Sequence, residues 1–304
     1  MKCDEEEFQE VEKKIGEGVK SEVFKVIDNR TGEVMCKKAI KEVSDDRAFK
    51  TLQDALKEIY VSQTVHHPCI CDLLGYNTKE RLPAIGKEEE KTIVALFFEL
   101  LPYSVKEVAS KNLLSNTLKV RIAVEVAFGM SHLHSRGMMH RDLKLENIMM
   151  NSVFDSKIID IGLVHASEMS ATSTSLTNGI GTLAYMSPEM VNEEEYDNKT
   201  DVYSYGIILF ALFTGSLPKQ SMRDRLNNVS MEYPKASSGI SDYCISLIKR
   251  CTSFKAAERP TFNEIIDDMC CNNFSLTSEV DVKAIKHRFR ELNSIRSGQN
   301  KDKK

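Results

Sequence analysis

The chain has 304 residues and a formal net charge of −4, with 41% hydrophobic and 28% charged residues. This length fits one large domain, or two lobes that share a cleft, with a sizeable core. The charge gives no electrostatic case for binding nucleic acid or an anionic membrane, and no apolar run approaches the roughly 20 residues that a membrane span needs. The acidic start lacks a signal-peptide layout, and none of the eight cysteines forms a C-x-x-C pair. We therefore expect reduced cysteines and a cytoplasmic protein, with the nucleus as the alternative.

The first hundred residues predict an antiparallel β-meander. Three short segments are rich in β-branched and apolar residues, and turn signals separate them: Val11–Ile15, Val23–Ile27 and Glu33–Ile40. Apolar residues at helical spacing then predict a helix from about Arg47 to Val65. A continuous apolar strand is expected over Ile93–Leu101, where Pro102 ends it.

Beyond Pro102 the apolar period becomes helical. One stripe runs through Leu118, Ile122, Val126, Met130 and Leu133 and stops near Gly137. Further helices are predicted at Tyr203–Phe213, which is apolar all round, at Ser241–Arg250 and at Phe262–Met269. A basic helix over Lys283–Arg296 could dock on the larger lobe or bind a partner. The expected organisation is a small β-rich lobe (1–101), a larger helical lobe (102–274) and a basic tail (275–304).

A glycine pair lies between the first two predicted strands. Gly16 and Gly18 would let a strand–turn–strand backbone lie close over phosphates, where any Cβ would obstruct. A plain glycine hairpin is the alternative, because Ser21 stands where a third phosphate-loop glycine would be. A second strand follows instead of a helix, which disfavours a dinucleotide-binding fold.

A lysine and a glutamate arrive on adjacent predicted elements. Strand alternation puts Lys38 on the same face as Cys36, and Glu58 lies on the following helix. If these two side chains pair, the lysine is held toward phosphate oxygens. A single strand lysine is more often simply solvated, so neither residue is diagnostic alone.

The segment Met138–Met150 carries the strongest chemical signal. It places Asp142, Lys144 and Asn147 in a loop between two apolar runs. Asp142 can accept a proton from an attacking hydroxyl, Lys144 can neutralise a moving phosphoryl group, and Asn147 can ligate a hard cation through oxygen. Phosphoryl transfer depends mainly on positioning and charge stabilisation, which these groups supply.

Several motifs together carry a family resemblance. In chain order they are the glycine pair, Lys38, His140–Asp142, Asp160–Gly162, Gly181–Glu189, Asp201–Gly206 and Glu258–Phe262. From about Val11 to Met269 the chain resembles eukaryotic protein kinases of the serine/threonine type, with features of the tyrosine-kinase-like group. The resemblance implies an α+β bilobal fold, with a small antiparallel β-sheet lobe that carries helix C and a larger, mainly helical lobe. It also implies transfer of the γ-phosphoryl group of ATP to serine or threonine hydroxyls of proteins, with Mg²⁺ as cofactor.

The resemblance also implies roles for individual residues. Asp142 would be the catalytic base with Lys144 beside it, Lys38 and Glu58 the lysine–glutamate pair, and Asn147 and Asp160 the magnesium ligands. Glu189 and Arg259 would form a buried ion pair. The nucleotide would contact Ile15, Gly16, Gly18, Val23, Cys36, Lys38, Phe98, Glu99, Leu101 and Met149.

Two departures from the family pattern suggest a hypothesis about regulation. Ile161 stands for the usual phenylalanine, and Ser62 for a larger apolar residue, in the stack of side chains that joins the lobes. Less buried area would let the helix that carries Glu58 dock loosely and need help. In the alternative, neighbouring side chains fill the gap.

The stretch between Asp160 and Thr182 is rich in hydroxyl side chains. Such composition also suits any flexible loop, but Arg141 next to Asp142 favours pairing with a loop phosphate. We expect an upstream kinase to act on Ser175 or Thr177. The rival functions are a pseudokinase scaffold, which the complete set of catalytic residues disfavours, and a small-molecule kinase.

Overall fold

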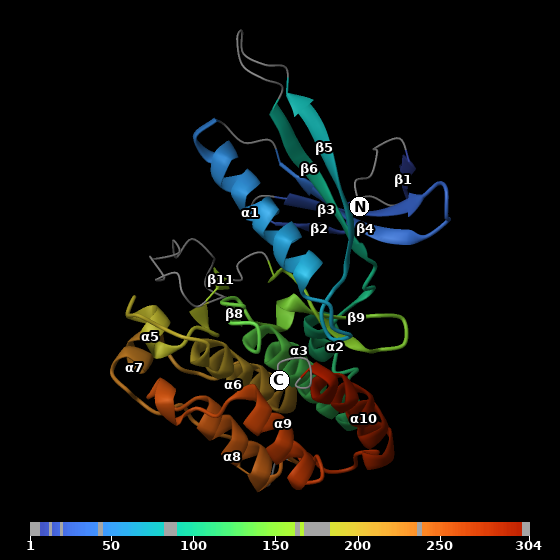
Figure 1. Ribbon diagram of the computed structural model, residues 1–304. Coiled ribbons are helices and arrows are strands. Elements are labelled where there is room, and N and C mark those ends of the chain that lie inside the picture. Colours follow the sequence, from blue (N-terminus) through green and yellow to red (C-terminus); the bar gives the residue numbers. More distant parts are fainter. Residues whose placement is uncertain are drawn as a thin grey trace. The chain divides into compact units, whose positions relative to one another are not determined.

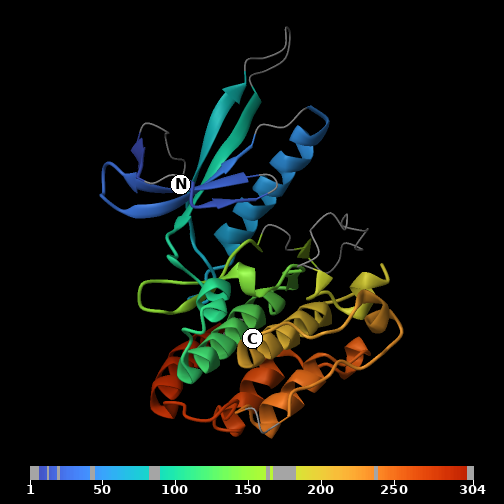
Figure 2. The same ribbon diagram turned by 180° about the vertical axis from the view of Figure 1, so that it is seen from behind.

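The computed structural model describes residues 7–11, 14–18, 21–41, 45–81, 90–161, 165–166, 183–235 and 239–299. The chain divides into two compact units. The N-terminal unit contains Met1–His66, Ile70–Pro102 and Asp160–Leu163, and the C-terminal unit contains His67–Cys69, Tyr103–Ile159 and Val164–Lys304. Figures 1 and 2 show the strands of the first unit and the helices of the second from opposite sides. None of the described helices is both long and apolar enough to cross a membrane.

The N-terminal unit is built on an antiparallel sheet with the order β1-β3-β4-β6-β5, and β2 also pairs with β3. One long helix, α1 (Asp45–Thr64), packs against β5 and β6. The strands are β1 (Phe8–Glu10), β2 (Gly16–Glu17), β3 (Ser21–Asp28), β4 (Val34–Ile40), β5 (Leu73–Arg81) and β6 (Glu90–Glu99). The expected small antiparallel lobe with one helix is therefore confirmed.

The core of this unit follows from strand alternation on β6. Ala95 and Phe97 belong to one buried cluster, whereas Leu96 between them packs with Ala55 and Ile59 of α1. Lys38 pairs in register with Leu96. Because cross-strand partners share a face of the sheet, this register turns the Lys38 side chain toward α1.

Two strand predictions in this unit need correction, and one strand was missed. The strand predicted over Val11–Ile15 is wrong, since strands lie on either side at β1 and β2. Its apolar end residues are 45% and 46% exposed, so they contribute no core that would require a strand there. The strand predicted over Ile93–Leu101 ends at Glu99, and β5 was missed because most of its residues are polar and two register shifts interrupt its pairing.

The C-terminal unit is mainly helical. Its helices are α2 (Val105–Ser110), α3 (Asn116–His134), α5 (Pro188–Val191), α6 (Lys199–Thr214), α7 (Met222–Leu226), α8 (Asp242–Cys251), α9 (Phe262–Cys271) and α10 (Val282–Gln299). Short strands form two small sheets: β7 (Tyr103–Ser104), β9 (Ile148–Met150) and β10 (Ser156–Ile158) in one, and β8 (Met138–Met139) and β11 (His165–Ala166) in the other. The helices predicted for this part are confirmed with small shifts at their ends.

The buried helix α6 is the centre of this unit. Every residue from Thr200 to Phe213 is buried, and the helix ends at Gly215, whose φ of 78° suits a glycine cap. Gly206 allows α8 to approach, since a Cβ there would lie 2.8 Å from the Cys251 Cβ and 2.6 Å from Thr252 Cγ2. This close packing fixes α6 against the end of α8.

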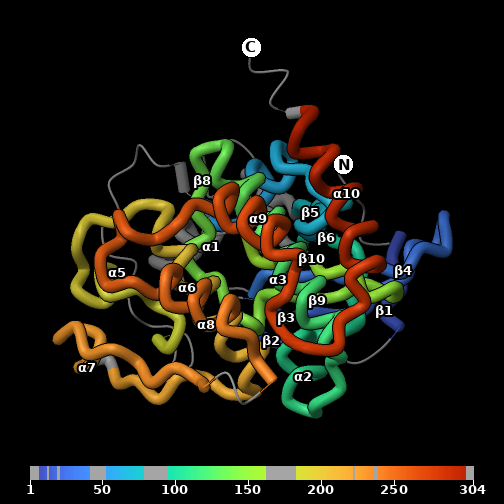
Figure 3. The backbone as a smooth tube through the Cα atoms, turned by 90° about the horizontal axis from the view of Figure 1, so that it is seen from below, coloured from blue at the N-terminus to red at the C-terminus, as the bar shows by residue number. Residues whose placement is uncertain are grey.

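The basic tail helix α10 packs on α3 within the C-terminal unit (Figure 3). Ile285, Phe289 and Leu292 are buried there, and the Phe289 ring meets Phe128 edge-on at 5.4 Å. Of the two sequence alternatives for the tail, docking on the larger lobe is the one that the structure shows.

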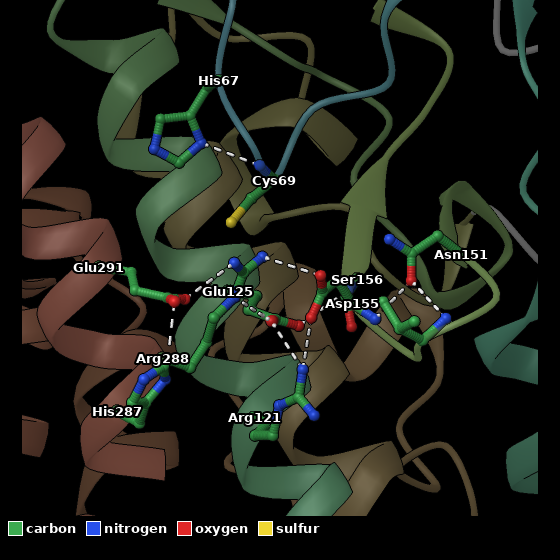
Figure 4. Close-up of polar contacts among 11 residues, drawn as sticks. His67, Cys69, Arg121, Glu125, Asn151, Asp155, Ser156, His287, Arg288 and Glu291 are labelled. Carbon is green, nitrogen blue, oxygen red and sulfur yellow. Dashed lines mark hydrogen bonds and ion pairs between the residues drawn. The ribbon is translucent and has the colours of Figure 1, made fainter. Parts of the chain in front are cut away.

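A network of charges joins α10 to the rest of the unit (Figure 4). Arg288 Nε donates to Glu125 Oε1 at 2.8 Å, and Arg121 donates to Asp155 at 2.6 Å. The Ser156 backbone N–H donates to Glu125 Oε2 at 2.8 Å. Glu125 on α3 thereby links α10 to β10, and we call Arg121, Glu125, Asp155 and Arg288 the Glu125 cluster.

Candidate active site

One group of predicted site residues meets in the N-terminal unit. Lys38 Nζ on β4 donates to both Glu58 carboxylate oxygens on α1, at 2.8 and 2.9 Å, and to Asp160 Oδ1 at 3.1 Å. Burial alone would lower the pKa of Lys38, but the Glu58 and Asp160 carboxylates outweigh it and raise the pKa above its ordinary value. Lys38 is therefore a fixed cation, and we call these three residues the Lys38 cluster.

Asp160 combines exposure with backbone strain. Its φ of 61° lies in the left-handed region that non-glycine residues seldom occupy. Its side chain is 45% exposed, whereas that of Glu58 is 8% exposed. Asp160 thus presents carboxylate oxygen to solvent next to a lysine that Glu58 holds.

The hypothesis that the Glu58 helix docks loosely is not supported. The Lys38–Glu58 pair is formed, and Ile161 and Ser62 are 3% and 2% exposed, so no open gap remains at either position. The cluster of Ala55, Ile59 and Leu96 also takes packing from Leu73 and neighbouring side chains. The alternative, in which neighbours fill the space, is the arrangement found. The Ser62 hydroxyl is nevertheless buried without a hydrogen-bond partner.

The glycine hairpin lies at the β2–β3 connection. Gly16 pairs with Val23, and the Gly18 N–H donates to the Ser21 carbonyl at 2.8 Å. A Cβ on Gly18 would lie 3.2 Å from Ser21 Oγ, which is tighter than ordinary contact. A hairpin rather than a strand-to-helix turn is what the sequence predicted; residues 19–20 lie outside the described part.

The remaining predicted nucleotide contacts of the N-terminal unit lie on or beside the sheet. Cys36 pairs with Phe98 in register, and burial raises the pKa of the Cys36 thiol to about 11. The Glu99 carboxylate accepts a hydrogen bond from the Asp72 backbone N–H at 2.8 Å and so fixes the chain just before β5. Leu101 is buried, and the exposed Ile15 side chain lies just before β2. Met149 lies on β9 of the C-terminal unit.

A second group of predicted site residues meets in the C-terminal unit. Asp142 Oδ2 accepts hydrogen bonds from Lys144 Nζ at 2.6 Å and from Asn147 Nδ2 at 3.2 Å. Asn147 Nδ2 also donates to the Asp142 carbonyl at 2.8 Å, which leaves the Asn147 amide oxygen for another partner. Asp142 Oδ1 is buried and has no hydrogen-bond partner. A buried carboxylate oxygen without a donor is an acceptor for an incoming proton.

A buried aspartate, Asp201, holds this loop. The sequence analysis did not predict this role. Asp201 accepts the backbone N–H groups of His140 and Arg141, each at 2.9 Å, and His134 Nε2 lies 2.8 Å from it. Burial would raise the pKa of Asp201, but His134 and these backbone donors lower it overall. The signal that could have revealed it was an acidic residue at the start of an otherwise apolar helix.

His140 ties the loop to the residue that directly follows β10. Its Nε2 lies 3.2 Å from the Ile159 carbonyl, and its Nδ1 lies 3.3 Å from the Asp142 N–H. This pattern assigns the proton to Nε2, since the Asp142 N–H requires an acceptor at Nδ1. The imidazole thus helps to set the position of Asp142.

The predicted Glu189–Arg259 ion pair is confirmed. Arg259 Nη1 and Nη2 donate to the two Glu189 oxygens at 2.5 and 2.8 Å, and the Arg259 side chain is fully buried. Burial would raise the pKa of Glu189, but Arg259 lowers it overall. Gly162, Ser175, Thr177 and Thr182 lie outside the described residues.

Oxygen donors for a metal ion occur in each unit. In the described part of the chain no group of three or more His, Cys, Asp or Glu side chains could hold a metal ion alone. Magnesium typically takes one or two protein oxygens and completes its shell with phosphate oxygens and waters. The Asn147 amide oxygen and the Asp160 carboxylate are donors of this kind.

Comparison with known proteins adds an independent finding. The family model for the protein kinase domain matches residues 9–270. A probable serine/threonine-protein kinase of Dictyostelium discoideum is 32% identical over 84% of this chain and 19% of its own length. Fibroblast growth factor receptor 1 of Dugesia japonica is 29% identical over 86% of this chain and 32% of its length. A serine/threonine/tyrosine-protein kinase of Arabidopsis thaliana is 28% identical over 83% of this chain and 63% of its length. The chain thus spans less than two thirds of each of these relatives.

Proposed function

The chain belongs to the protein kinase family, and from this premise we propose that it transfers the γ-phosphoryl group of ATP to serine or threonine hydroxyls of protein substrates. The observation that carries the proposal is the Asp142 carboxylate. One oxygen is engaged by Lys144 and Asn147, and the other is buried and without a donor. An acceptor hydroxyl that donates to this free oxygen has a base within reach.

In the proposed transfer, one phosphorus–oxygen bond forms as another breaks. The acceptor oxygen forms a bond to the γ-phosphorus, the bond from that phosphorus to the β–γ bridging oxygen breaks, and ADP leaves. The hydroxyl proton passes to Asp142 Oδ1, while Lys144 provides positive charge beside the base. Lys38, held by Glu58, is the cation for the nucleotide phosphates.

Protein kinase domains use ATP with a divalent metal ion, and we propose Mg²⁺ here. Asn147 and Asp160 offer the oxygen donors that Mg²⁺ prefers. When bound, the metal ion neutralises phosphate charge. A comparison of activity with Mg²⁺, Mn²⁺ and Ca²⁺ tests this part, and equal or greater activity with another ion would contradict it.

The proposed preference for serine and threonine rests on Lys144, two residues after the base. The relatives make this a real question, because one of them is named as a serine/threonine/tyrosine kinase. Radiolabelled ATP with a generic protein substrate, followed by phosphoamino-acid analysis, decides it. We expect phosphoserine and phosphothreonine from the wild type, and no label above background with Asp142→Asn. Label on tyrosine would overturn the preference, and nucleotide binding without transfer would support the scaffold alternative.

We also propose control by an upstream kinase acting on Ser175 or Thr177. Arg141 supports this, since its Nε and Nη2 atoms are buried without hydrogen-bond partners while its guanidinium lies 5.5 Å from the centre of the Tyr196 ring. Such N–H groups can donate charge-assisted hydrogen bonds to phosphate oxygens. Mass spectrometry of active protein tests this, and full activity without phosphate on either residue would contradict it.

We also propose a cytoplasmic location, which cell fractionation tests. The seven cysteines in the described residues are all free, which is compatible with a reducing compartment.

A further inference from the structure

The segment Leu183–Ser187 lies against the catalytic loop. The Tyr185 hydroxyl contacts the backbone of Leu145 and the carboxylate of Glu146, two residues that stand between Lys144 and Asn147. Burial and the Glu146 carboxylate raise the pKa of Tyr185, which is 4% exposed. The segment therefore borders the loop that an acceptor hydroxyl must reach.

Three backbone carbonyls of this segment accept hydrogen bonds from buried side chains. Arg225 Nη1 on α7 donates to the Leu183 carbonyl at 2.6 Å and to the Met186 carbonyl at 2.8 Å. Ser204 Oγ on α6 donates to the Tyr185 carbonyl at 2.9 Å. One guanidinium nitrogen thus fixes both ends of a four-residue stretch.

Arg225 occupies an unfavourable position for a charge. It is 5% exposed, its Nε has no hydrogen-bond partner, and no carboxylate in the described part of the chain forms an ion pair with it. Burial lowers its pKa, and Tyr203 opposes this. A buried cation without a counter-ion destabilises a fold unless its hydrogen bonds offset desolvation. Its two bonds to the Leu183–Met186 backbone are its main compensation.

The short helix α7 is itself braced. The Asp224 N–H donates to Ser221 Oγ at 3.1 Å, and the Ser221 N–H donates to Asp224 Oδ2 at 2.9 Å, which forms a capping box. The cap fixes the start of the helix that presents Arg225. Arg223 lies two residues earlier on the same helix and is exposed.

We infer that Arg225 is a positioning residue for the protein substrate: it fixes Leu183–Met186 in the conformation against which the acceptor peptide is placed beside Asp142. The inference rests on the proposed function, because it concerns the acceptor in that reaction. Leu183, Ala184 and Met186 are partly exposed and offer the contact surface. ATP and a water acceptor need no such surface.

The test compares Arg225→Met with Arg223→Met in the full chain. For Arg225→Met we expect kcat/KM for a peptide acceptor to fall by roughly 10- to 100-fold, as misplacement of a reactant does. The KM for ATP and the slow ATP hydrolysis measured without peptide should stay within about twofold of wild type, because they do not use the segment. Arg223→Met should match the wild type in all three measurements.

Other outcomes distinguish the inference from the proposed function. Unchanged peptide kinetics in Arg225→Met would overturn the inference, and so would equal losses of peptide transfer and ATP hydrolysis, since these indicate a general structural role. Wild-type protein that transfers no phosphate would instead overturn the proposed function. If Arg225→Met does not fold, Arg225→Lys keeps the charge but not the shape of the guanidinium. We then expect a selective, smaller loss toward peptide, and an unselective loss would overturn the inference.

Discussion

Two charged clusters in this protein use the same chemistry in different surroundings. In the Lys38 cluster of the N-terminal unit, one lysine meets Glu58 and Asp160, and Asp160 is 45% exposed. In the Glu125 cluster of the C-terminal unit, Arg288 and Arg121 meet Glu125 and Asp155, and the Glu125 side chain is fully buried. The first cluster leaves an acid open to other partners, whereas the second satisfies its central acid internally. An open cluster suits ligand chemistry, and a closed one holds segments together.

The Arg259–Glu189 pair should show the largest effect on folding, because the Arg259 side chain is fully buried and two hydrogen bonds join the two side chains. Arg259→Met should lower the free energy of unfolding by about 3–5 kcal/mol, because it leaves a buried carboxylate without its cation. Urea denaturation measures this. The matched control is Lys255→Met, which breaks the exposed Lys255–Glu258 contact and should change stability by less than about 1 kcal/mol. Equal losses in the two variants would remove the distinction between enclosed and exposed pairs.

In the open cluster the main effect should fall on activity. Lys38→Met should reduce kcat/KM by about 10²–10³, or roughly 2.7–4 kcal/mol of transition-state stabilisation, as loss of a preorganised cationic donor does. Steady-state kinetics with a peptide acceptor measures it. The control is Lys37→Met on the opposite face of β4, where the lysine forms an ion pair with the exposed Glu10. A comparable loss in the control would contradict the assignment of Lys38.

In the closed cluster the effect should fall on stability. Arg288→Met should lower the free energy of unfolding by about 2–3 kcal/mol, less than Arg259→Met, because Glu125 retains the Ser156 N–H and Arg121. A double-mutant cycle with Glu125→Gln should show coupling above about 1 kcal/mol. Arg290→Met, at an exposed position on the same helix, is the control. If both arginine variants behave alike, the apolar residues of α10 alone hold the helix.

The two clusters also show what sequence can predict. Lys38, Glu58 and Asp160 stand in motifs whose spacing marks them, and the register of β4 with β6 then places Lys38 toward α1. The Glu125 cluster gives no such signal, since Glu125 lies beside an apolar stripe and its partners Ser156 and Arg288 are 31 and 163 residues away in the chain. Likewise, neither the polar strand β5 nor the carbonyl contacts of Arg225 could be predicted, because neither depends on local periodicity. Sequence thus predicted the architecture and the motif residues, and long-range packing supplied the rest.

The smallest predicted effect concerns His67, which is buried beside the Glu125 cluster (Figure 4). Burial, together with the positive surroundings of His132, Arg288, Arg136 and Lys157, lowers the pKa of His67 to about 3. Its neutral Nδ1 accepts the Cys69 N–H at 3.1 Å. An unfolded histidine has a pKa of about 6.5, so the unfolded chain binds the extra proton first as pH falls. The contribution of neutral His67 to the free energy of unfolding is therefore complete above about pH 6.5 and is lost as pH falls toward 3.

His67→Gln should therefore make stability less dependent on pH. Between pH 7 and pH 5 the wild type should lose about 2 kcal/mol more of its unfolding free energy than the variant, since one proton is taken up on unfolding across most of that range. Urea denaturation at both pH values measures the difference. Exposed His66, one residue earlier, provides the control variant His66→Gln, which should keep the wild-type pH dependence. If the unfolding free energies of wild type and His67→Gln change equally with pH, His67 binds its proton in the folded protein as readily as in water. The surroundings of His67 would then be accessible to solvent.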